Sequence, residues 1–341
     1  STTTAPTNPL AFPRDIFAAL APTNFLTTHL SSSSTSAHPL RANHRSASTP
    51  RAPQIHTGSL THAHGSAVVR LGNTVAVCGV RGEILVSDSD EPISNTARTE
   101  EYVENESEDD EVEKLGLLVP NFEINTGSTP SLIPGLAPSA FAQTLTARTR
   151  DLLGSTRMIR AADLRITYSK STTENVGEEA EEEEEQETVV KARWVLYIDT
   201  VFLSIDGNAF DCAWLGILSA LRSAKLPYAY FDEEYEGILC SDDPKEARAL
   251  RLRGCPVPST FAVFEGQGDE KGRWWMVDPD AFEESVTRES VCVVVDGEEG
   301  GKTVIKRVEK SGGGAVDRGV LKEMVERARE RWSVWKGLIE G

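Results

Sequence analysis

The apolar residues of the chain follow two kinds of pattern, and residues 194–224 contain both. Residues 194–205 form an apolar run rich in β-branched side chains, which predicts a strand. A polar turn at residues 206–208 leads into an apolar run that predicts a helix extending to Pro227, where the proline would end it. Helix N-termini favour anions, so a strand that turns directly into a helix is a candidate anion site.

Similar patterns predict the other elements. Apolar side chains recur at helical spacing over residues 317–338, which indicates a long helix with one buried face. Two β-branched runs, at 66–70 and 74–80, flank a short turn and predict a hairpin. The remaining predictions are helices at 13–20 and 139–153 and strands near Ile55 and Ile166 and at 117–124, 255–263, 274–277, 291–295 and 303–308.

These elements predict an α+β fold made of small sheets backed by helices. We expect an N-terminal tail with a short helix over residues 1–40 and a first domain over residues 41–230. A second, smaller domain is expected over residues 253–338, with the boundary between Pro227 and Arg253.

Charge alters this picture only locally. The 341-residue chain has a formal net charge of −18, but residues 99–113 and 174–187 each contain nine acidic residues and no Lys or Arg. Outside these tracts, 35 acidic residues balance 35 basic ones. We therefore predict two acidic loop inserts, at about 94–114 and 170–189, which are solvated and repel polyanions only nearby. The acidic composition does not exclude a nucleic-acid partner.

The five cysteines contain no C-x-x-C pair and lie mostly in apolar surroundings. Buried, reduced thiols and an intracellular compartment are the expected reading. No apolar run approaches the ~18 residues that would span a bilayer, and no signal peptide is recognisable, so we expect a soluble protein without a membrane partner.

Several motifs together resemble one family. Arg41, Arg45 and Arg51 have the spacing of the R-x-D-G-R-x5-R motif of RNase PH-like proteins, with Asn43 and His44 in place of Asp and Gly. The block TGSLTHAHGSAVVRLGNTVAVCGVRGEI is similar to the strand pair that opens their first domain. The run WVLYIDTVFLSIDGNAFDCAWLGILSAL resembles the non-catalytic branch found in the eukaryotic RNA exosome ring. VPNFEI, PVPSTFAVF and WWMVDPD match that branch in order, and the resemblance covers residues 41–338 apart from the inserts.

The resemblance implies an RNase PH-like fold, with a ribosomal protein S5 domain 2-like first domain and a smaller RNase PH C-terminal domain. Active members have D-G-G-T-R at the corner between strand and helix, and the arginine holds the attacking phosphate. Here the corner reads D-G-N-A-F, so Phe210 stands where that arginine would be. A phenyl ring cannot replace the charge-assisted bonds of a guanidinium.

Two acidic residues of the active members have counterparts in Asp278 and Glu284. One reading makes them a residual acid or metal site. The favoured reading is a solvated turn between two strands, helped by Pro279, because charged turn residues are common.

Four arginines form the one basic cluster that could follow an RNA backbone, namely Arg148, Arg150, Arg157 and Arg160. The alternative is an ordinary amphipathic helix end, where cations are favoured. His62 and His64 lack further ligands for a metal. Trp274 and Trp275 must face opposite sides of a strand, and packing is the expected role of both.

The resemblance implies a non-catalytic structural subunit of the RNA exosome ring, which scaffolds the ring and its RNA channel for 3′→5′ RNA processing, rRNA maturation and RNA turnover. Expected partners are other RNase PH-like ring subunits, S1/KH cap subunits, a separate 3′→5′ nuclease and single-stranded RNA. We expect no cofactor and no metal, and a location in the nucleus, nucleolus and cytoplasm. The alternatives are an active phosphorolytic 3′→5′ exoribonuclease and an independent acidic binding module.

Overall fold

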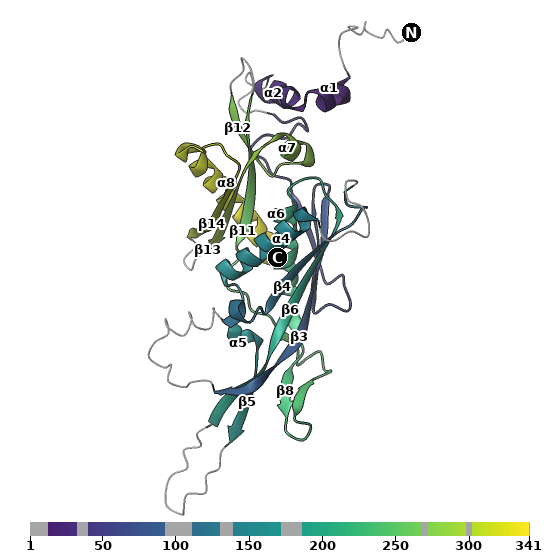
Figure 1. The fold of residues 1–341 in the computed structure, drawn as a ribbon, viewed down its shortest axis with the longest axis vertical. Coiled ribbons are helices and arrows are strands. Elements are labelled where there is room, and N and C mark those ends of the chain that lie inside the picture. Colours follow the sequence, from purple (N-terminus) through teal and green to yellow (C-terminus); the bar gives the residue numbers. More distant parts are fainter. Residues whose placement is uncertain are drawn as a thin grey trace, which may run out of the picture.

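The computed structural model describes residues 13–32, 40–92, 111–129, 139–171, 186–266, 272–297 and 302–340. The N-terminal tail and most of both acidic inserts lie outside these residues. Figure 1 shows a large twisted sheet in the lower part of the molecule and a smaller sheet above it, beside the two N-terminal helices.

The large sheet has the strand order β1-β2-β3-β6-β4, and β5 also pairs with β6. Its strands are β1 (Pro53–Thr57), β2 (Gly65–Leu71), β3 (Thr74–Pro92), β4 (Leu118–Ile124), β5 (Arg165–Ser171) and β6 (Gln186–Ser204). All pairs are antiparallel except β4 with β6. Gly72 and Asn73 alone separate the paired residues Leu71 and Thr74, so the predicted hairpin is confirmed.

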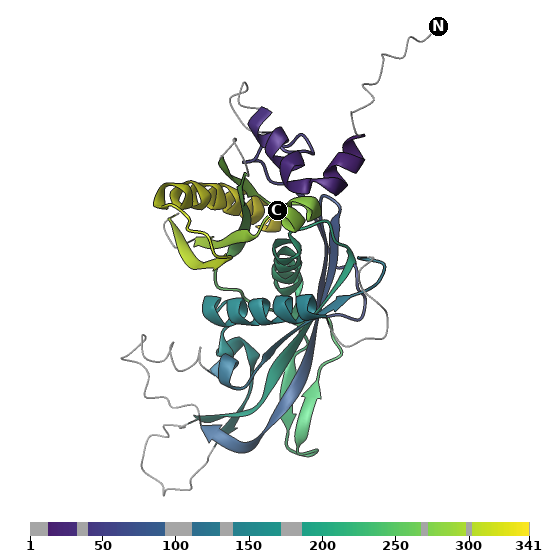
Figure 2. The ribbon, with the colours of Figure 1, turned by 45° about the horizontal axis from the view of Figure 1, so that its top comes forward.

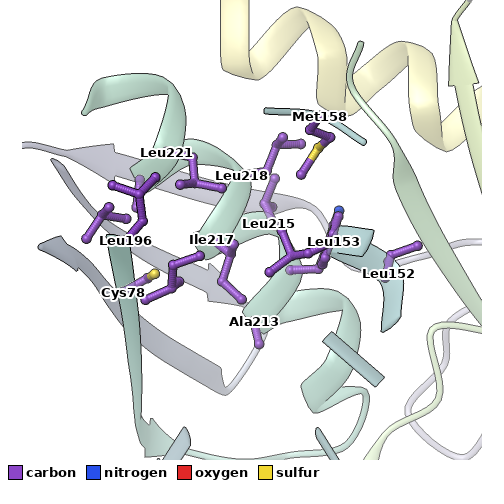
Figure 3. Close-up of a cluster of buried hydrophobic side chains, with 14 of the residues drawn as sticks. Cys78, Leu152, Leu153, Met158, Leu196, Ala213, Leu215, Ile217, Leu218 and Leu221 are labelled. Carbon is purple, nitrogen blue, oxygen red and sulfur yellow. The ribbon is translucent and has the colours of Figure 1, made fainter. Parts of the chain in front are cut away.

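This part of the chain contains three helices: α4 (Ala140–Thr156) and α5 (Ala161–Leu164) lie between β4 and β5, and α6 (Ala209–Ser223) follows β6. Every residue of α6 from 209 to 221 is buried, because the helix contacts β2 and β3 on one side and β11 of the smaller sheet on another. This burial explains why its sequence is apolar all round. Figure 3 shows Ile217 and Leu221 of α6 on the side of Cys78 of β3 and Leu196 of β6, and Leu218 on the side of Met158.

The smaller sheet has the order β12-β11-β13-β14. Its strands are β11 (Val257–Glu265), β12 (Arg273–Val277), β13 (Glu289–Gly297) and β14 (Thr303–Ser311), and its helices are α7 (Ala281–Val286) and α8 (Arg318–Glu340). The predicted apolar stripe of α8 is confirmed, since Met324, Ala328 and Trp335 are buried. The two tryptophans face opposite sides as expected: Trp275 packs beside Phe261 with α8, and Trp274 stacks on Phe264.

Of the N-terminal helices α1 (Arg14–Leu20) and α2 (Pro22–Ser32), α2 covers the face of the smaller sheet opposite α8, and α1 lies beside α2, as Figure 2 shows. Leu26 and Leu30 of α2 are buried against Phe264 and Met276, and Phe25 makes an edge contact with Phe282 of α7. With helices on both faces, β11 is buried along almost its whole length.

Two short strand pairs complete the described structure. The strands β7 (Lys225–Leu226) and β10 (Arg248–Ala249) pair with each other, and β8 (Ala229–Asp232) forms a hairpin with β9 (Gly237–Cys240).

Several boundaries differ from the sequence-based predictions. The helix at the corner ends at Ser223 rather than at Pro227, because Lys225 and Leu226 leave the helix and pair with β10. The second insert is shorter than predicted, since β5 and β6 extend into both of its ends. The last residues of the first insert form a helical turn in which Val112 is buried. The α+β fold class is confirmed, and the division into domains at 41–230 and 253–338 stays a prediction.

Candidate functional site

The corner between β6 and α6 is held in an unusual backbone conformation. Gly207 and Asn208 both have left-handed φ values, +71° and +49°. A Cβ atom on Gly207 would lie only 2.4 Å from the carbonyl carbon of Asp280. Glycine is therefore required here, and asparagine tolerates the left-handed region better than most residues. The corner thus lies directly against residues 278–284.

Phe210 is buried in the core rather than exposed to solvent. It is 5% exposed, and its ring lies beside Trp214, with 6.5 Å between ring centroids. The guanidinium carbon of Arg148 stands 3.9 Å from the centroid of the Phe210 ring. The Nε of Arg148 also donates to Glu309 of β14 at 3.1 Å. The guanidinium of Arg148 is consequently held between the Phe210 ring and the Glu309 carboxylate.

Asp278 is the centre of the site. It is fully buried, and its carboxylate accepts hydrogen bonds from the Nε and Nη2 of Arg51 at 2.8 and 2.7 Å. The backbone N–H of Arg51 and the amide of Asn208 donate to it as well, each at 2.7 Å. Arg45 adds a weaker bond at 3.4 Å. Both carboxylate oxygens are therefore occupied by groups of the chain itself.

Burial alone would raise the pKa of Asp278. The hydrogen bond from Arg51 and the positive charges of Arg331 and Arg51 outweigh this effect and lower the pKa to about 2. Asp278 also has a left-handed φ of +53°, a conformation that this bond network holds in place.

The expectation of a solvated turn is therefore wrong for Asp278, whereas Glu284 is exposed. Asp280 caps α7 by accepting from the backbone N–H of Glu283, and Glu283 bonds back to the backbone of Asp280. Arg41, which is 1% exposed, pairs with Glu283 at 3.2 Å and donates to the carbonyls of Ala47 and Asp278. Asp278 and Glu283 can be buried because the arginines of residues 41–51 fold over them and compensate their charge.

Glu284 belongs to α7, and its side chain reaches the start of α6. Its Oε1 accepts the backbone N–H of Asn208 at 2.7 Å, so an internal carboxylate occupies a place where a helix N-terminus attracts anions. Burial of the carboxylate raises the pKa of Glu284. The size of this effect is limited, because the residue as a whole is exposed to solvent. A pocket of about 250 Å³ lies between Arg148, Phe210, Glu284 and Arg288.

A second buried pair, which sequence reasoning missed, joins α6 to α8. Asp211 is fully buried and accepts from the backbone N–H and the hydroxyl of Thr260 at 2.9 and 2.7 Å. Arg331 of α8 forms an ion pair with it, and the Arg331 guanidinium carbon lies 4.3 Å from the Trp335 ring centroid. The available signal was an arginine within the apolar stripe of α8, three residues after the buried Ala328.

The four candidate RNA-binding arginines do not share one pocket. Arg150 and Arg157 line a second pocket of about 350 Å³ together with Glu113 and Asp151. Arg157 is the C-cap of α4, and Arg160 precedes α5 as its N-cap. The C-cap position agrees with the amphipathic-helix alternative for Arg157. Arg148 stands apart from them at Phe210 and Glu309.

The Nδ1 of His64 accepts the backbone N–H of Gly82 at 2.9 Å. Within the described ranges, no three His, Cys, Asp or Glu side chains are grouped as metal ligands. None of the described helices combines the length and apolarity needed to cross a membrane.

Comparison with known proteins agrees with this geometry. Residues 49–227, just over half of the chain, match the family model for the 3′ exoribonuclease family, domain 1. The chain belongs to the 3′ exoribonuclease family. Exosome complex component rrp43 of Schizosaccharomyces pombe is 28% identical to it over 323 residues, which cover 95% of this chain and 97% of the relative. Exosome complex component Rrp42 of Aeropyrum pernix is 27% identical over 300 residues, 88% of each protein.

Solved structures place this family member in the expected fold. A chain from a structure described as the Archaeoglobus fulgidus exosome with RNA bound to the active site has a TM-score of 0.59, with 21% identity. The match covers 93% of this chain and 98% of that one. A chain of an archaeal exosome core has a TM-score of 0.57 and 20% identity, and the match covers 95% and 100%. The RNase PH-like fold is confirmed.

Proposed function

We propose that this chain is a non-catalytic structural subunit of an RNA exosome ring, which supports 3′→5′ RNA processing and degradation by building the ring and its RNA channel. The observation that carries the proposal is Phe210, buried under Arg148 at the position where the family resemblance places a phosphate-binding arginine. The names of the relatives, exosome components of a fission yeast and an archaeon, support the assembly.

The electrostatics of the corner oppose phosphate binding. A phosphate ion at the start of α6 would meet the Phe210 ring, which offers no hydrogen bond, and the Glu284 carboxylate, which holds the Asn208 N–H. When ionised, Glu284 repels a phosphate. Whether ionised or protonated, its carboxyl group accepts the backbone N–H of Asn208, which is then not available to a phosphate. Arg148 lies over the Phe210 ring, and its charge is partly compensated by its ion pair with Glu309.

Asp278 is equally poorly suited to catalyse phosphorolysis. A general acid works best when its pKa lies near the working pH. The pKa of Asp278 is about 2, and its carboxylate oxygens already accept bonds from Arg51 and Asn208. The active phosphorolytic exoribonuclease therefore remains the alternative rather than the proposal.

We propose that the partners are other RNase PH-like subunits, S1/KH cap proteins, a separate 3′→5′ nuclease and single-stranded RNA passing through the channel. If this chain contacts the RNA backbone, the arginines that are best placed are Arg150 and Arg157, because both line one pocket while Arg148 is held at Phe210. The corresponding cellular location is the nucleus, nucleolus and cytoplasm, where rRNA maturation and RNA turnover take place.

The test combines an assembly measurement with an activity measurement. The purified chain is mixed with RNase PH-like partner subunits and sized by chromatography, and the ring fractions are incubated with single-stranded RNA and phosphate. We expect a stable ring and no phosphate-dependent release of nucleoside diphosphates by this chain. Release from a ring with inactivated partners, lost in Glu284→Gln, would establish the phosphorolytic alternative. A chain that stays monomeric with every partner would instead favour the independent binding module.

A variant sharpens the activity measurement. Phe210→Arg restores the guanidinium but leaves Asp278 bound to Arg51 and Glu284 bound to Asn208. We therefore expect no phosphorolysis from this variant. Activity gained by this single substitution would show that the acidic residues still function, against the role assigned to them here.

A further inference from the structure

The β8–β9 hairpin presents an aromatic face to solvent. Its inner face packs on the body: Phe231 makes an edge contact with Tyr168 of β5 at 5.4 Å, and Ile238 packs on the large core. Side chains alternate across a strand, so Tyr228 and Tyr230 share the opposite face. Their rings stack at 5.9 Å, and the residues are 36% and 38% exposed.

The tip of the hairpin adds a third tyrosine. Tyr235 is 76% exposed, and among the residues that the structure describes its ring has no aromatic or cationic partner. The turn that carries it is ordered, because the Asp232 side chain accepts the backbone N–H groups of Glu234 and Tyr235 at 2.9 and 3.0 Å. A large, exposed ring on a fixed turn loses little conformational freedom when it binds a partner.

Charge indicates the partner's chemistry. Residues 229–243 contain six acidic residues and no lysine or arginine. Two cations of the chain already lie on rings of this region: the Arg248 guanidinium carbon is 4.7 Å from the Tyr228 ring centroid, and the Lys191 Nζ is 4.8 Å from that of Phe231. The aromatic rings therefore accept cations, and the flanking carboxylates attract them further. The same carboxylates repel a nucleic-acid backbone.

We infer that Tyr228, Tyr230 and Tyr235 with the flanking acids, here called the tyrosine hairpin, form a docking surface for an arginine- or lysine-rich segment of a partner protein. Tyrosines of this kind are enriched among the residues that contribute most to protein interfaces. The tyrosine hairpin lies at the far end of the large sheet from α7 and the N-terminal helices (Figures 1 and 2). It is thus separate from the corner at Phe210, and the inference does not rest on the proposed ring function.

The experiment measures binding of a fluorescein-labelled octa-arginine peptide to the full chain by fluorescence anisotropy. Substituting Tyr235 by serine should weaken binding about threefold, and the double variant Tyr230→Ser/Tyr235→Ser about tenfold, since each exposed cation–π contact contributes a factor of this order. Neither change alters the net charge, so attraction of the peptide to the acidic tracts at 99–113 and 174–187 is the same in all variants. The matched control, Phe141→Ser, removes a 45% exposed ring from α4 and should leave the affinity unchanged.

Near-ultraviolet circular dichroism of each variant checks that the fold is intact. An octa-arginine affinity equal in the wild type and the double variant overturns the inference, because binding would then reside in the acidic tracts. A twelve-nucleotide oligouridylate is titrated in parallel. If its affinity exceeds that of the peptide and is lost in the double variant, the surface is an RNA-stacking platform and the inference is likewise overturned.

Discussion

Substituting Asp278 by asparagine tests the claim that this buried carboxylate stabilises the fold. The change keeps the shape of the side chain but removes its charge and replaces one acceptor by a donor. The new amide would face the guanidinium of Arg51 or the amide of Asn208, both of which are donors. Arg51 would keep a charge on a side chain that is only 9% exposed, without the carboxylate to which it is now bonded.

The magnitude follows from the pKa. Asp278 has a pKa of about 2 in the folded chain and 3.8 when unperturbed. Each unit corresponds to about 1.4 kcal/mol, so the ionised carboxylate contributes about 2–3 kcal/mol at pH 7. Breaking a buried pair by removing one partner costs about 3–5 kcal/mol in other proteins. We therefore expect Asp278→Asn to lower the free energy of unfolding by about 3 kcal/mol at pH 7.

The pH dependence has a definite sign. Because the folded pKa of Asp278 lies below the unfolded one, its contribution is complete above about pH 4 and is lost as the pH falls towards 2. The wild type should lose about 2 kcal/mol over that window through this residue alone, and the variant should lose none of it. The stability difference between the two proteins should therefore narrow between pH 4 and pH 2.

The assay is urea unfolding followed by tryptophan fluorescence, at pH 7 and at steps down to pH 2, with the first unfolding transition compared. Asp280→Asn is the matched control. It lies two residues away and caps α7, and asparagine caps a helix about as well as aspartate, so its cost should stay below about 1 kcal/mol. A cost of less than about 1 kcal/mol for Asp278→Asn, or a difference that does not narrow in acid, would refute the reasoning.

Two further predictions concern other parts of the chain. Four of the five thiols are buried, and burial raises the pKa of each to about 12: Cys78, Cys212, Cys255 and Cys292. A disulfide-exchange reagent at pH 8 should therefore modify only one thiol of the native chain, that of the exposed Cys240. The variant Cys240→Ser should show no modified thiol. Gly207→Ala should destabilise the chain by about 3 kcal/mol in urea unfolding, because it adds a clash to an unfavourable φ. Gly116→Ala, with φ +62° but no atom within 4 Å, should cost about 1 kcal/mol; equal costs would show that the close approach at the corner is unimportant.

Elements whose own sequence buries one face could be predicted from that sequence. The β2–β3 hairpin and the stripe of α8 are local patterns, and the structure reproduces both. In contrast, α2 was missed because its Thr- and Ser-rich sequence has a weak intrinsic helix preference. It forms because Leu26 and Leu30 bury against the smaller sheet, a contact that its sequence alone does not reveal.

At the candidate site, too, the sequence did not reveal contacts between distant segments. Motif positions located Phe210, Asp278 and Glu284, but gave Asp278 the wrong surroundings. Its main partner, Arg51, lies 227 positions away in the chain, so neither residue's local sequence shows the pair. From sequence alone, a charged residue is expected to be exposed to solvent, because burial requires a compensating charge. For Asp278 that charge is Arg51, which only the tertiary structure brings next to it.

The charges at the corner compensate one another so fully that they leave little for a ligand. Three arginines from residues 41–51 contact the acidic turn at 278–284, Arg331 pairs with Asp211, and Arg148 pairs with Glu309. Each pair connects segments that are distant in the chain, so the charges of this corner join the large sheet, the smaller sheet and the N-terminal segment. In a phosphorolytic enzyme, part of that positive charge would have to stay free for phosphate and RNA. A corner built this way holds the chain in one shape, which agrees with the structural role that we propose for it.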